Sequence, residues 1–314
     1  MNKDLLVKIK TFLPLSFGIF LVYYSFQNTS AEDKINILNS ITNANYTFVF
    51  LSICIGILSH LSRAIRWKYL ILPLGYKLNI LNSIMSIFAG FLSNFGIPRS
   101  GEILRASLIY YYQKIPFEKS FGTIVTERII DFLILLSCIF LGINISSKIK
   151  LPDSFLSSNF ILYLILFVAI TCLIFILIST KNLRIKVFIF FDGLKQGMLS
   201  ISKIENKKYF FFHTIFIWTS YFFMLYIVKF SMPETFSLGF EPIFIAFIAG
   251  AIAMIITNGG IGSYPLAIAS IISQYEVSYE AALAFGWIVW TSQTIMIVIL
   301  GSLSFVFLPI LNKK

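Results

Sequence analysis

The sequence predicts an all-α, polytopic integral membrane protein with about six full transmembrane helices and two opposed re-entrant helical hairpins. Three observations lead to this fold class. Hydrophobic residues make up 58% of the 314 residues and charged residues only 12%, far from the averages of soluble domains. Several apolar runs are long enough to cross a bilayer. Two further apolar runs are interrupted by breaks that a lipid-facing helix could not tolerate.

Six uninterrupted segments have the length and apolar composition of membrane spans. They are Thr11–Phe26, Tyr46–Leu70, Gly122–Asn144, Phe160–Ser179, Tyr209–Phe230 and Ala281–Pro309. A signal peptide is the alternative for the first segment, but no small-residue cleavage site follows it, so we interpret it as a span. Because no polar block is long enough for a soluble unit, we predict one membrane domain over residues 1–314. Its amphipathic connector, at about 181–208, would lie on the cytoplasmic membrane surface.

The two interrupted segments predict re-entrant hairpins at about 80–112 and 242–275. The first breaks at Gly96-Ile97-Pro98 and the second at Asn258-Gly259-Gly260-Ile261-Gly262. The returning arm Glu102–Tyr112 covers only roughly 16 Å, about half of a ~30 Å hydrocarbon core. Unpaired backbone groups and bare charges are costly in lipid, so both breaks are expected to line a cavity enclosed by protein or filled with water.

The distribution of lysine and arginine predicts the orientation. With six spans and two hairpins both termini lie on one side, which holds 19 basic residues against four on the other. This bias predicts a multi-pass protein of a bacterial-type inner (plasma) membrane with cytoplasmic termini. The net charge of +11 is then explained by topology and anionic headgroups, and we expect no nucleic-acid partner. The hairpins would enter from opposite sides, similar to inverted-repeat transporters with a site near the midplane.

Charged residues gather at the first break and in the helix that follows it. Three are basic and three are acidic: Arg99, Arg105 and Arg128, and Glu102, Glu127 and Asp131. Glu127 and Asp131 are spaced i, i+4 and share a helix face. Intramembrane ionisable groups commonly mark a substrate path, whereas a balanced cluster can also be a buried salt-bridge network that clamps the hairpin. The sequence leaves both interpretations open.

The second break supplies a different kind of candidate site, made of Asn258, Gly259, Gly260, Gly262 and Tyr264. Its glycines allow unusual backbone conformations and expose backbone N–H groups. A helix that restarts near Ser263 would aim its positive N-terminal end into the cavity, which suits a phosphate or a carboxylate. The alternative is that the glycines only permit tight helix crossing.

Signals for catalysis are missing from the sequence. There is no paired-aspartate motif, zinc-ligand helix, nucleophile elbow or nucleotide-hydrolysing module. The cysteines Cys54, Cys138 and Cys172 lie singly in apolar segments. We therefore predict no enzyme activity, no metal and no cofactor, and any transport would be downhill, ion-coupled or driven by another protein. An embedded enzyme using Glu127 and Asp131 as acid and base is the weakest alternative.

At these residues the chain resembles the lysylphosphatidylglycerol synthase transmembrane (flippase-like domain) family. The resemblance rests on four motifs: Arg63-x-x-Arg66-Trp67, Asn94-x-x-x-Pro98-Arg99-x-Gly101-Glu102-x-x-Arg105, Thr126-Glu127-Arg128-x-x-Asp131 and Gly259-Gly260-Ile261-Gly262. It implies translocation of an amphiphilic lipid between leaflets and adds Asn94 to the candidate substrate-binding residues. The sequence ends at Lys314 directly after the last span, so we expect the membrane module without the aminoacyl-transfer domain. Ser263-Tyr264-Pro265 stands where the family often has an acidic residue, which argues against a cationic headgroup.

We therefore expect a flippase-like membrane protein that moves a phospholipid or lipid-linked headgroup through a charged midplane cavity. The three arginines would receive a phosphate-bearing headgroup, and the three carboxylates would hold them in place. The alternative is a non-transporting membrane subunit that recruits or regulates a lipid- or glycan-modifying enzyme. Membrane lipids, such an enzyme and a second copy of the chain are the candidate partners.

Overall fold

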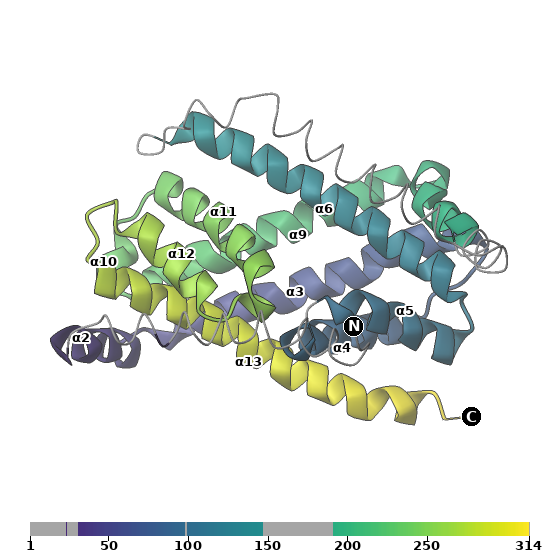
Figure 1. Cartoon of the computed structure of the whole chain (residues 1–314), viewed down its shortest axis with the longest axis horizontal. Helices are drawn as coiled ribbons and strands as arrows, with labels where there is room; N and C mark the ends of the chain where they lie inside the picture. Colours follow the sequence, from purple (N-terminus) through teal and green to yellow (C-terminus); the bar gives the residue numbers. More distant parts are fainter. Residues whose placement is uncertain (1–22, 24–30, 98, 147–190, 314) are drawn as a thin grey trace, which may run out of the picture.

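The computed structural model describes residue 23 and residues 31–97, 99–146 and 191–313, and in this part of the chain every regular element is a helix (Figure 1). Four helices are long and apolar enough to cross a membrane. They are α3 (Tyr46–Ile71), α6 (Phe117–Ile145), α9 (Lys207–Val228) and α13 (Tyr279–Leu311). The all-α polytopic prediction is thus confirmed. The other two predicted spans, Thr11–Phe26 and Phe160–Ser179, lie outside the described residues except for Tyr23.

Polar residues set where the helices begin. Asn45 starts α3 by accepting a hydrogen bond from the Thr47 N–H at 3.1 Å, and Ser278 starts α13 in the same way with Ala281 at 3.2 Å. Such N-caps satisfy backbone donors that the first turn leaves free. Helix α6 begins ahead of the predicted Gly122, because the carbonyl of Pro116 already accepts the first intrahelical bond from Ser120 at 3.0 Å.

The two interrupted segments fold as helical hairpins. The first consists of α4 (Ile80–Gly96) and α5 (Ser100–Gln113). The second consists of α11 (Phe240–Ile256), the 3-10 turn η5 (Asn258–Gly260) and α12 (Ser263–Ile272). An arm of 17 residues such as α4 or α11 reaches only about 26 Å, less than a ~30 Å hydrocarbon core. The arm lengths fit re-entrant segments, and their entry into a membrane stays a prediction.

The hairpins point toward each other from opposite ends of the molecule. The base of the first lies at the C-terminal end of α13, where the amides of Asn82 and Asn312 bond each other twice at 2.9 Å. The second packs against the N-terminal part of α13, and its tip reaches the first at Gly259. A Cβ on Gly259 would lie 2.6 Å from Cδ1 of Phe95 in α4. A side chain at position 259 would have to displace the Phe95 ring and adopt a φ of 61°, so glycine is favoured where the two tips meet.

Shorter elements complete the described chain. Helix α2 (Ala31–Thr42) occupies a stretch for which the sequence predicted no helix. Short helical turns are η1 (Leu72–Leu74), η3 (Ser200–Lys203), η4 (Lys229–Ser231) and α10 (Pro233–Phe236). Of the predicted connector 181–208, the structure describes a helix at 191–199 followed by η3. That helix touches the start of α6, where a Cβ on Gly197 would lie 2.8 Å from the Gly122 Cα.

The apolar core has two centres. The larger one joins α11, α12 and the N-terminal half of α13 to the adjoining parts of α3 and α9. The smaller one surrounds Trp67 of α3 and includes Ile109 of α5, Ile124 of α6 and Phe210 of α9. Trp67 directly follows Arg66, so charged side chains of α3 lie at the edge of this smaller centre.

Candidate functional site

The tip of the first hairpin is held closed by polar contacts between α4 and α5. Asn94 Oδ1 accepts the Gly101 N–H at 2.8 Å, and the hydroxyls of Ser93 and Ser100 contact each other. The backbones cross so closely that a Cβ on Gly101 would overlap the carbonyl oxygen of Gly90. Glycine at position 101 is therefore required by the close approach, and it fixes where Glu102 and Arg105 stand on α5.

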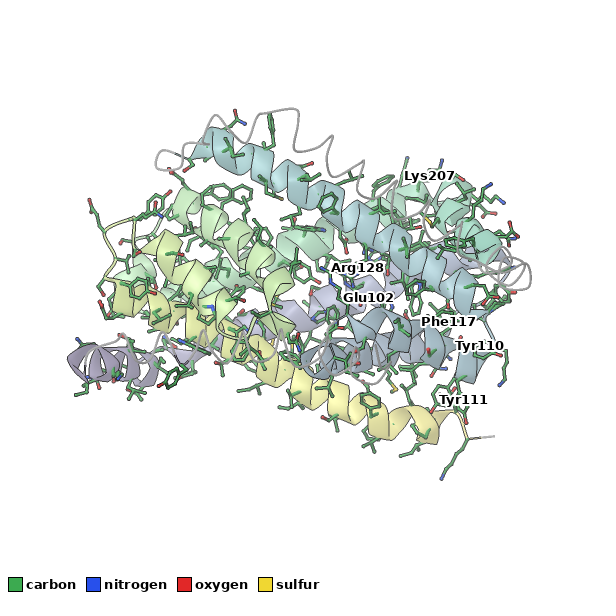
Figure 2. The ribbon with its side chains drawn as sticks, in the orientation of Figure 1. Glu102, Tyr110, Tyr111, Phe117, Arg128 and Lys207 are labelled. Atoms are coloured by element: carbon green, nitrogen blue, oxygen red, sulfur yellow. The ribbon has the colours of Figure 1, made fainter. Side chains whose placement is uncertain are left out.

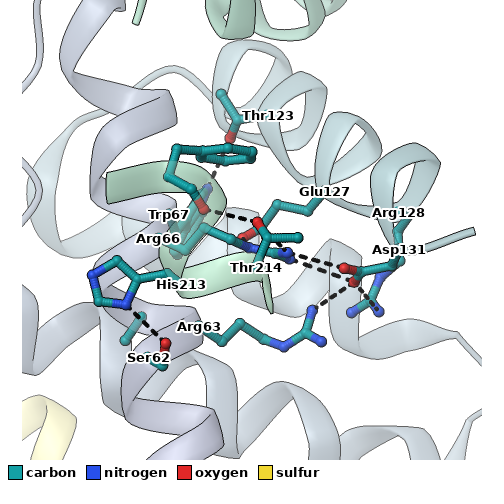
Figure 3. A network of polar contacts seen from close by, with 12 residues as sticks. Ser62, Arg63, Arg66, Trp67, Thr123, Glu127, Arg128, Asp131, His213 and Thr214 are labelled. Atoms are coloured by element: carbon teal, nitrogen blue, oxygen red, sulfur yellow. Dashed lines mark hydrogen bonds and ion pairs between the residues drawn. The ribbon is translucent and has the colours of Figure 1, made fainter. Parts of the chain in front are cut away.

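Below this tip, two arginines of α3 reach the carboxylates of α6 (Figure 3). Arg63 Nη1 lies 3.0 Å from Asp131 Oδ2, and Arg66 Nη1 lies 3.0 Å from Asp131 Oδ1. Arg66 Nε also lies 3.4 Å from Glu127 Oε1. The i, i+4 spacing of the two carboxylates puts both of them on the α6 face that meets α3. Asp131 thus receives two guanidinium groups that stand one helical turn apart.

Arg105 of α5 joins the network through Glu127. Its Nη1 donates to Glu127 Oε2 at 2.6 Å, and its guanidinium carbon lies 3.7 Å from the centroid of the Trp67 ring. The Trp67 indole N–H donates to Thr123 Oγ1 at 2.8 Å, which fixes the ring plane. Arg105 and Glu127 are buried. The pair therefore sits in a site of low dielectric, where each ion depends strongly on the other.

Arg128 and Glu102 form a more open pair at the edge of the network. Arg128 Nε lies 3.1 Å from Glu102 Oε1, and its Nη1 lies 3.6 Å from Asp131 Oδ2. The side chain of Arg128 is 41% exposed and that of Glu102 is 23% exposed. Both lie in the middle of the molecule, where α6 crosses the first hairpin (Figure 2). They can change partners at lower cost than the buried pairs.

Polar side chains of α9 also contact the network. Tyr221 Oη accepts from Arg63 Nη2 at 2.9 Å, and Thr214 Oγ1 accepts from Arg66 Nη1 at 3.3 Å. The Trp218 indole N–H approaches Asp131 Oδ1 at 3.4 Å. These contacts tie α3, α6 and α9 together around one polar centre.

The network is not electrically balanced. Arg63, Arg66, Arg105 and Arg128 stand against three carboxylates, so its formal charge is +1. Some of its buried polar atoms have no hydrogen-bond partner in the described part of the chain. They include Nε and Nη2 of Arg105 and Oε2 of Glu102. A network with a net positive charge and free donors on the buried Arg105 is a site that attracts an anion.

Two cavities meet at the Glu102–Arg128 pair. An open cavity of about 280 Å³ lies along α5 and α6. Apart from this pair its lining is apolar: Phe121, Ile124, Val125, Ile129 and Phe132. An inner cavity of about 20 Å³ lies within the first hairpin, lined by Asn94, Arg105 and the same pair, among others. The pair therefore stands between an apolar groove and a space about the size of one water molecule, which Arg105 and Asn94 line together with apolar residues.

The structure gathers most of the residues that the sequence singled out. Glu102, Arg105, Glu127, Arg128 and Asp131 form the network, and Asn94 lies beside it. Arg99 does not belong to it: it is exposed, adopts a left-handed backbone with φ 56° before α5, and has no ion pair within the described residues. The sequence predicted a cluster of three basic and three acidic residues that included Arg99. In the structure Arg63 and Arg66 supply positive charges to the cluster instead.

The second tip lies apart from the network. Gly259 meets Phe95 of α4, and Gly259 and Gly260 meet Trp290 of α13. Asn258 is buried, Gly262 directly precedes α12, and the ring of Tyr264 packs against Gly250. Of the three residues that open α12, Pro265 has no N–H and Ser263 donates to the Ile261 carbonyl at 2.8 Å. The anion site expected at this helix start thus has few donors, and it stays a prediction.

Sequence reasoning missed the part that α3 and α9 play. The sequence singled out Arg63 and Arg66 only within the Arg63-x-x-Arg66-Trp67 motif, outside the predicted charged cluster. Arg63 and Arg66 are spaced i, i+3 and Glu127 and Asp131 are spaced i, i+4, so each pair lies on one face of its helix. Two such faces of opposite charge were the signal in the sequence that the two helices could pair. Nothing in the sequence marked Thr214 or Tyr221. Among the described residues no group of three or more His, Cys, Asp or Glu side chains could hold a metal ion.

Comparison with known proteins agrees with this architecture. A family model described as the lysylphosphatidylglycerol synthase TM region matches residues 11–301. A UPF0104 membrane protein of Methanocaldococcus jannaschii is 29% identical over 155 residues, which are 48% of this chain and 45% of that protein. The matched part thus spans a little under half of the relative's length. No solved structure matches the chain.

Proposed function

This chain belongs to the lysylphosphatidylglycerol synthase TM region family, and from its site we propose that it moves an amphiphilic, phosphate-bearing lipid between membrane leaflets. The observation that carries the proposal is the position of the Glu102–Arg128 pair between an apolar groove and a small space next to the buried Arg105. A lipid has the same division into apolar chain and polar head. Its acyl chains would stay in the groove or in the bilayer, so the protein has to desolvate only the headgroup.

The charge of the network supports a headgroup with one negative charge. A phosphodiester would neutralise the excess positive charge, and the free Nε and Nη2 of Arg105 match the bidentate geometry that guanidinium groups use with phosphate. Entry would require Arg128 to leave Glu102, the most exposed of the ion pairs. Exposed Arg99 at the hairpin tip would attract the headgroup before it enters.

The distribution of lysines supports cytoplasmic termini. The end of the molecule that holds the start of α9 and the end of α13 carries nine of the eleven described lysines: Lys68, Lys77, Lys114, Lys119, Lys195, Lys203, Lys207, Lys208 and Lys313. Lys34 and Lys229 lie at the other end. The positive-inside rule places the lysine-rich end in the cytoplasm. We propose on this basis that the first hairpin opens to the cytoplasm and the second to the outside of an inner membrane.

Lipid movement in reconstituted vesicles tests the proposal. The probe is phosphatidylglycerol with a short fluorescent acyl chain, and its accessibility to an external quencher reports transfer. We expect Glu102→Gln and Arg128→Gln to slow transfer by about tenfold or more, the effect of losing one interaction with a charged group. Glu205→Gln, an exposed glutamate outside the network, serves as the matched control and should leave the rate unchanged.

Unchanged transfer in both network variants, and in Arg99→Ala, would contradict the site. A wild-type chain that moves no probe at all would instead favour the second candidate, a membrane subunit that recruits a lipid- or glycan-modifying enzyme. The exposed lysines around helix 191–199 and η3 are the observation behind that alternative. Its signature would be a stoichiometric enzyme partner that copurifies in mild detergent.

A further inference from the structure

The second hairpin contains a helix end whose carbonyl groups are left open. The C-cap residues of α3 to α6 each return their N–H to the preceding turn, whereas Thr257 after α11 is extended, with φ −122° and ψ 166°, and makes no such bond. In the described part of the chain, only the Ala253 carbonyl of the last turn accepts a bond, from Ser263 Oγ at 2.9 Å. The partial negative charge of α11 is therefore exposed at the tip.

The Asn258 side chain lies at this same helix end with its bonding capacity unused. It is 3% exposed, and among the described residues neither Oδ1 nor Nδ2 has a hydrogen-bond partner. A buried amide without partners is rare in native proteins and calls for a ligand or ordered water. Gly259, Gly260 and Gly262 have φ values of 61°, 76° and 70°, so the main chain next to Asn258 turns through left-handed conformations that favour glycine.

The atoms available at this tip favour a cation over an anion. The Trp290 indole N–H bonds the Gly259 carbonyl at 2.8 Å, and the hydroxyls of Thr257 and Ser263 are 2.7 Å apart. Among these side chains, Asn258 Nδ2 is the donor left without a partner in the described part of the chain. What remains is mainly neutral oxygen, from Asn258 Oδ1 and the carbonyls that end α11. Hard neutral oxygens without a carboxylate suit a monovalent alkali cation better than a divalent or transition metal.

We propose that the tip of the second hairpin binds one alkali-metal cation, Na⁺ or K⁺, through Asn258 Oδ1 and the open carbonyl oxygens at the end of α11. Broken helices bind coupling ions in this way in membrane transporters, through a half-helix C-terminus and unwound carbonyls. The site goes beyond the proposed lipid transport and does not depend on it.

A bound ion would act on the first hairpin through direct contacts. Gly259 lies against Phe95, the residue next to Asn94. Asn94 in turn holds the Gly101 N–H at the start of α5, which carries Glu102 and Arg105. Ordering the second tip would therefore stabilise the position of these two charged side chains. The ion would thus affect the headgroup site through these contacts, without binding to the site itself.

Ion binding is measured on the purified full chain in detergent. Unfolding temperature is recorded in NaCl, KCl and choline chloride at equal ionic strength, and equilibrium dialysis with radioactive sodium and rubidium counts bound ions. We expect a saturable stabilisation by Na⁺ or K⁺ that choline does not give, with one ion per chain. Asn258→Ala should raise the half-saturating concentration by about tenfold or more. Asn144→Ala, which removes an exposed amide bonded to its own helix, should respond like the wild type.

Equal unfolding temperatures in all three salts, together with no ion retained in dialysis by the wild-type chain, would overturn the proposal. An identical salt response in Asn258→Ala would also overturn it, since the stabilisation would then come from elsewhere. If Asn258→Ala does not fold, Asn258→Asp provides the test, because an added carboxylate should tighten binding rather than abolish it. None of these results depends on lipid transfer, so failure of the transport proposal is scored separately.

Discussion

Variants of the buried Arg105–Glu127 pair can distinguish two interpretations of the charged network: a salt-bridge network that only holds the first hairpin in place, and a site that binds the lipid headgroup. Glu127→Gln keeps the side-chain size and removes the charge that lies 2.6 Å from Arg105 Nη1. Removing one partner of a buried ion pair costs about 3–5 kcal/mol, since the other charge is left uncompensated. Arg66 keeps its contacts with Asp131, and Arg105 keeps the Trp67 ring. We therefore expect the lower end, about 3 kcal/mol.

A double-mutant cycle with Arg105→Gln separates stability from function. Free energies of unfolding are measured by denaturant titration in mixed micelles for the wild type, both single variants and the double variant. The double variant loses one charge of each sign and so keeps the formal charge of the wild-type network. It should therefore be more stable than the single variants predict together, by up to about 3 kcal/mol. Lipid transfer should stay low in the double variant, because Arg105 is needed for the phosphate.

Two outcomes would refute this reasoning. A cost below about 1 kcal/mol for Glu127→Gln would show that the pair is solvated, since exposed ion pairs contribute only that much. Full recovery of lipid transfer in the double variant, together with stability, would show that the pair is a clamp and does not contact the headgroup.

Three further predictions concern the first hairpin. Gly101→Ala should destabilise the chain by about 1–3 kcal/mol through overlap with the Gly90 carbonyl, whereas Gly239→Ala, with open space around it, should not; thermal unfolding compares the two. Arg99→Ala should change stability by less than about 0.5 kcal/mol and slow lipid transfer most at low salt, because an exposed charge acts by steering. Asn79→Ala should cost about 0.5–2 kcal/mol by removing the N-cap of α4, measured by denaturant titration.

The length of the apolar segments and the positions of helix-breaking residues predicted the outline of the fold. Apolar length predicted the four described spans, because a helix in lipid must satisfy its own backbone over the whole hydrocarbon thickness. The breaks at Pro98 and at Gly259-Gly260 predicted where the two hairpins turn. Helix ends were less well placed: α6 begins at Phe117 since capping contributes to a boundary that hydropathy alone does not detect.

The membership of the charged cluster was predictable only in part. Glu127 and Asp131 were singled out because carboxylates are rare in apolar helices, and their spacing put them on one face. Arg99, equally conspicuous in the sequence, lies exposed outside the network, while Arg63 and Arg66 supply the ion pairs. Sequence separation hid this, because the first hairpin lies between α3 and α6 along the chain.

The sequence by itself determined that this is an all-α membrane protein with two interrupted helices and a set of charges too costly to face lipid. Those properties follow from the free energy of transferring individual side chains from water to hydrocarbon. Only the tertiary structure decided which charges pair, that one positive charge is left over, and that Glu102 and Arg128 stand between an apolar groove and a small space next to Arg105. Those properties depend on distances between helices, which no local pattern encodes.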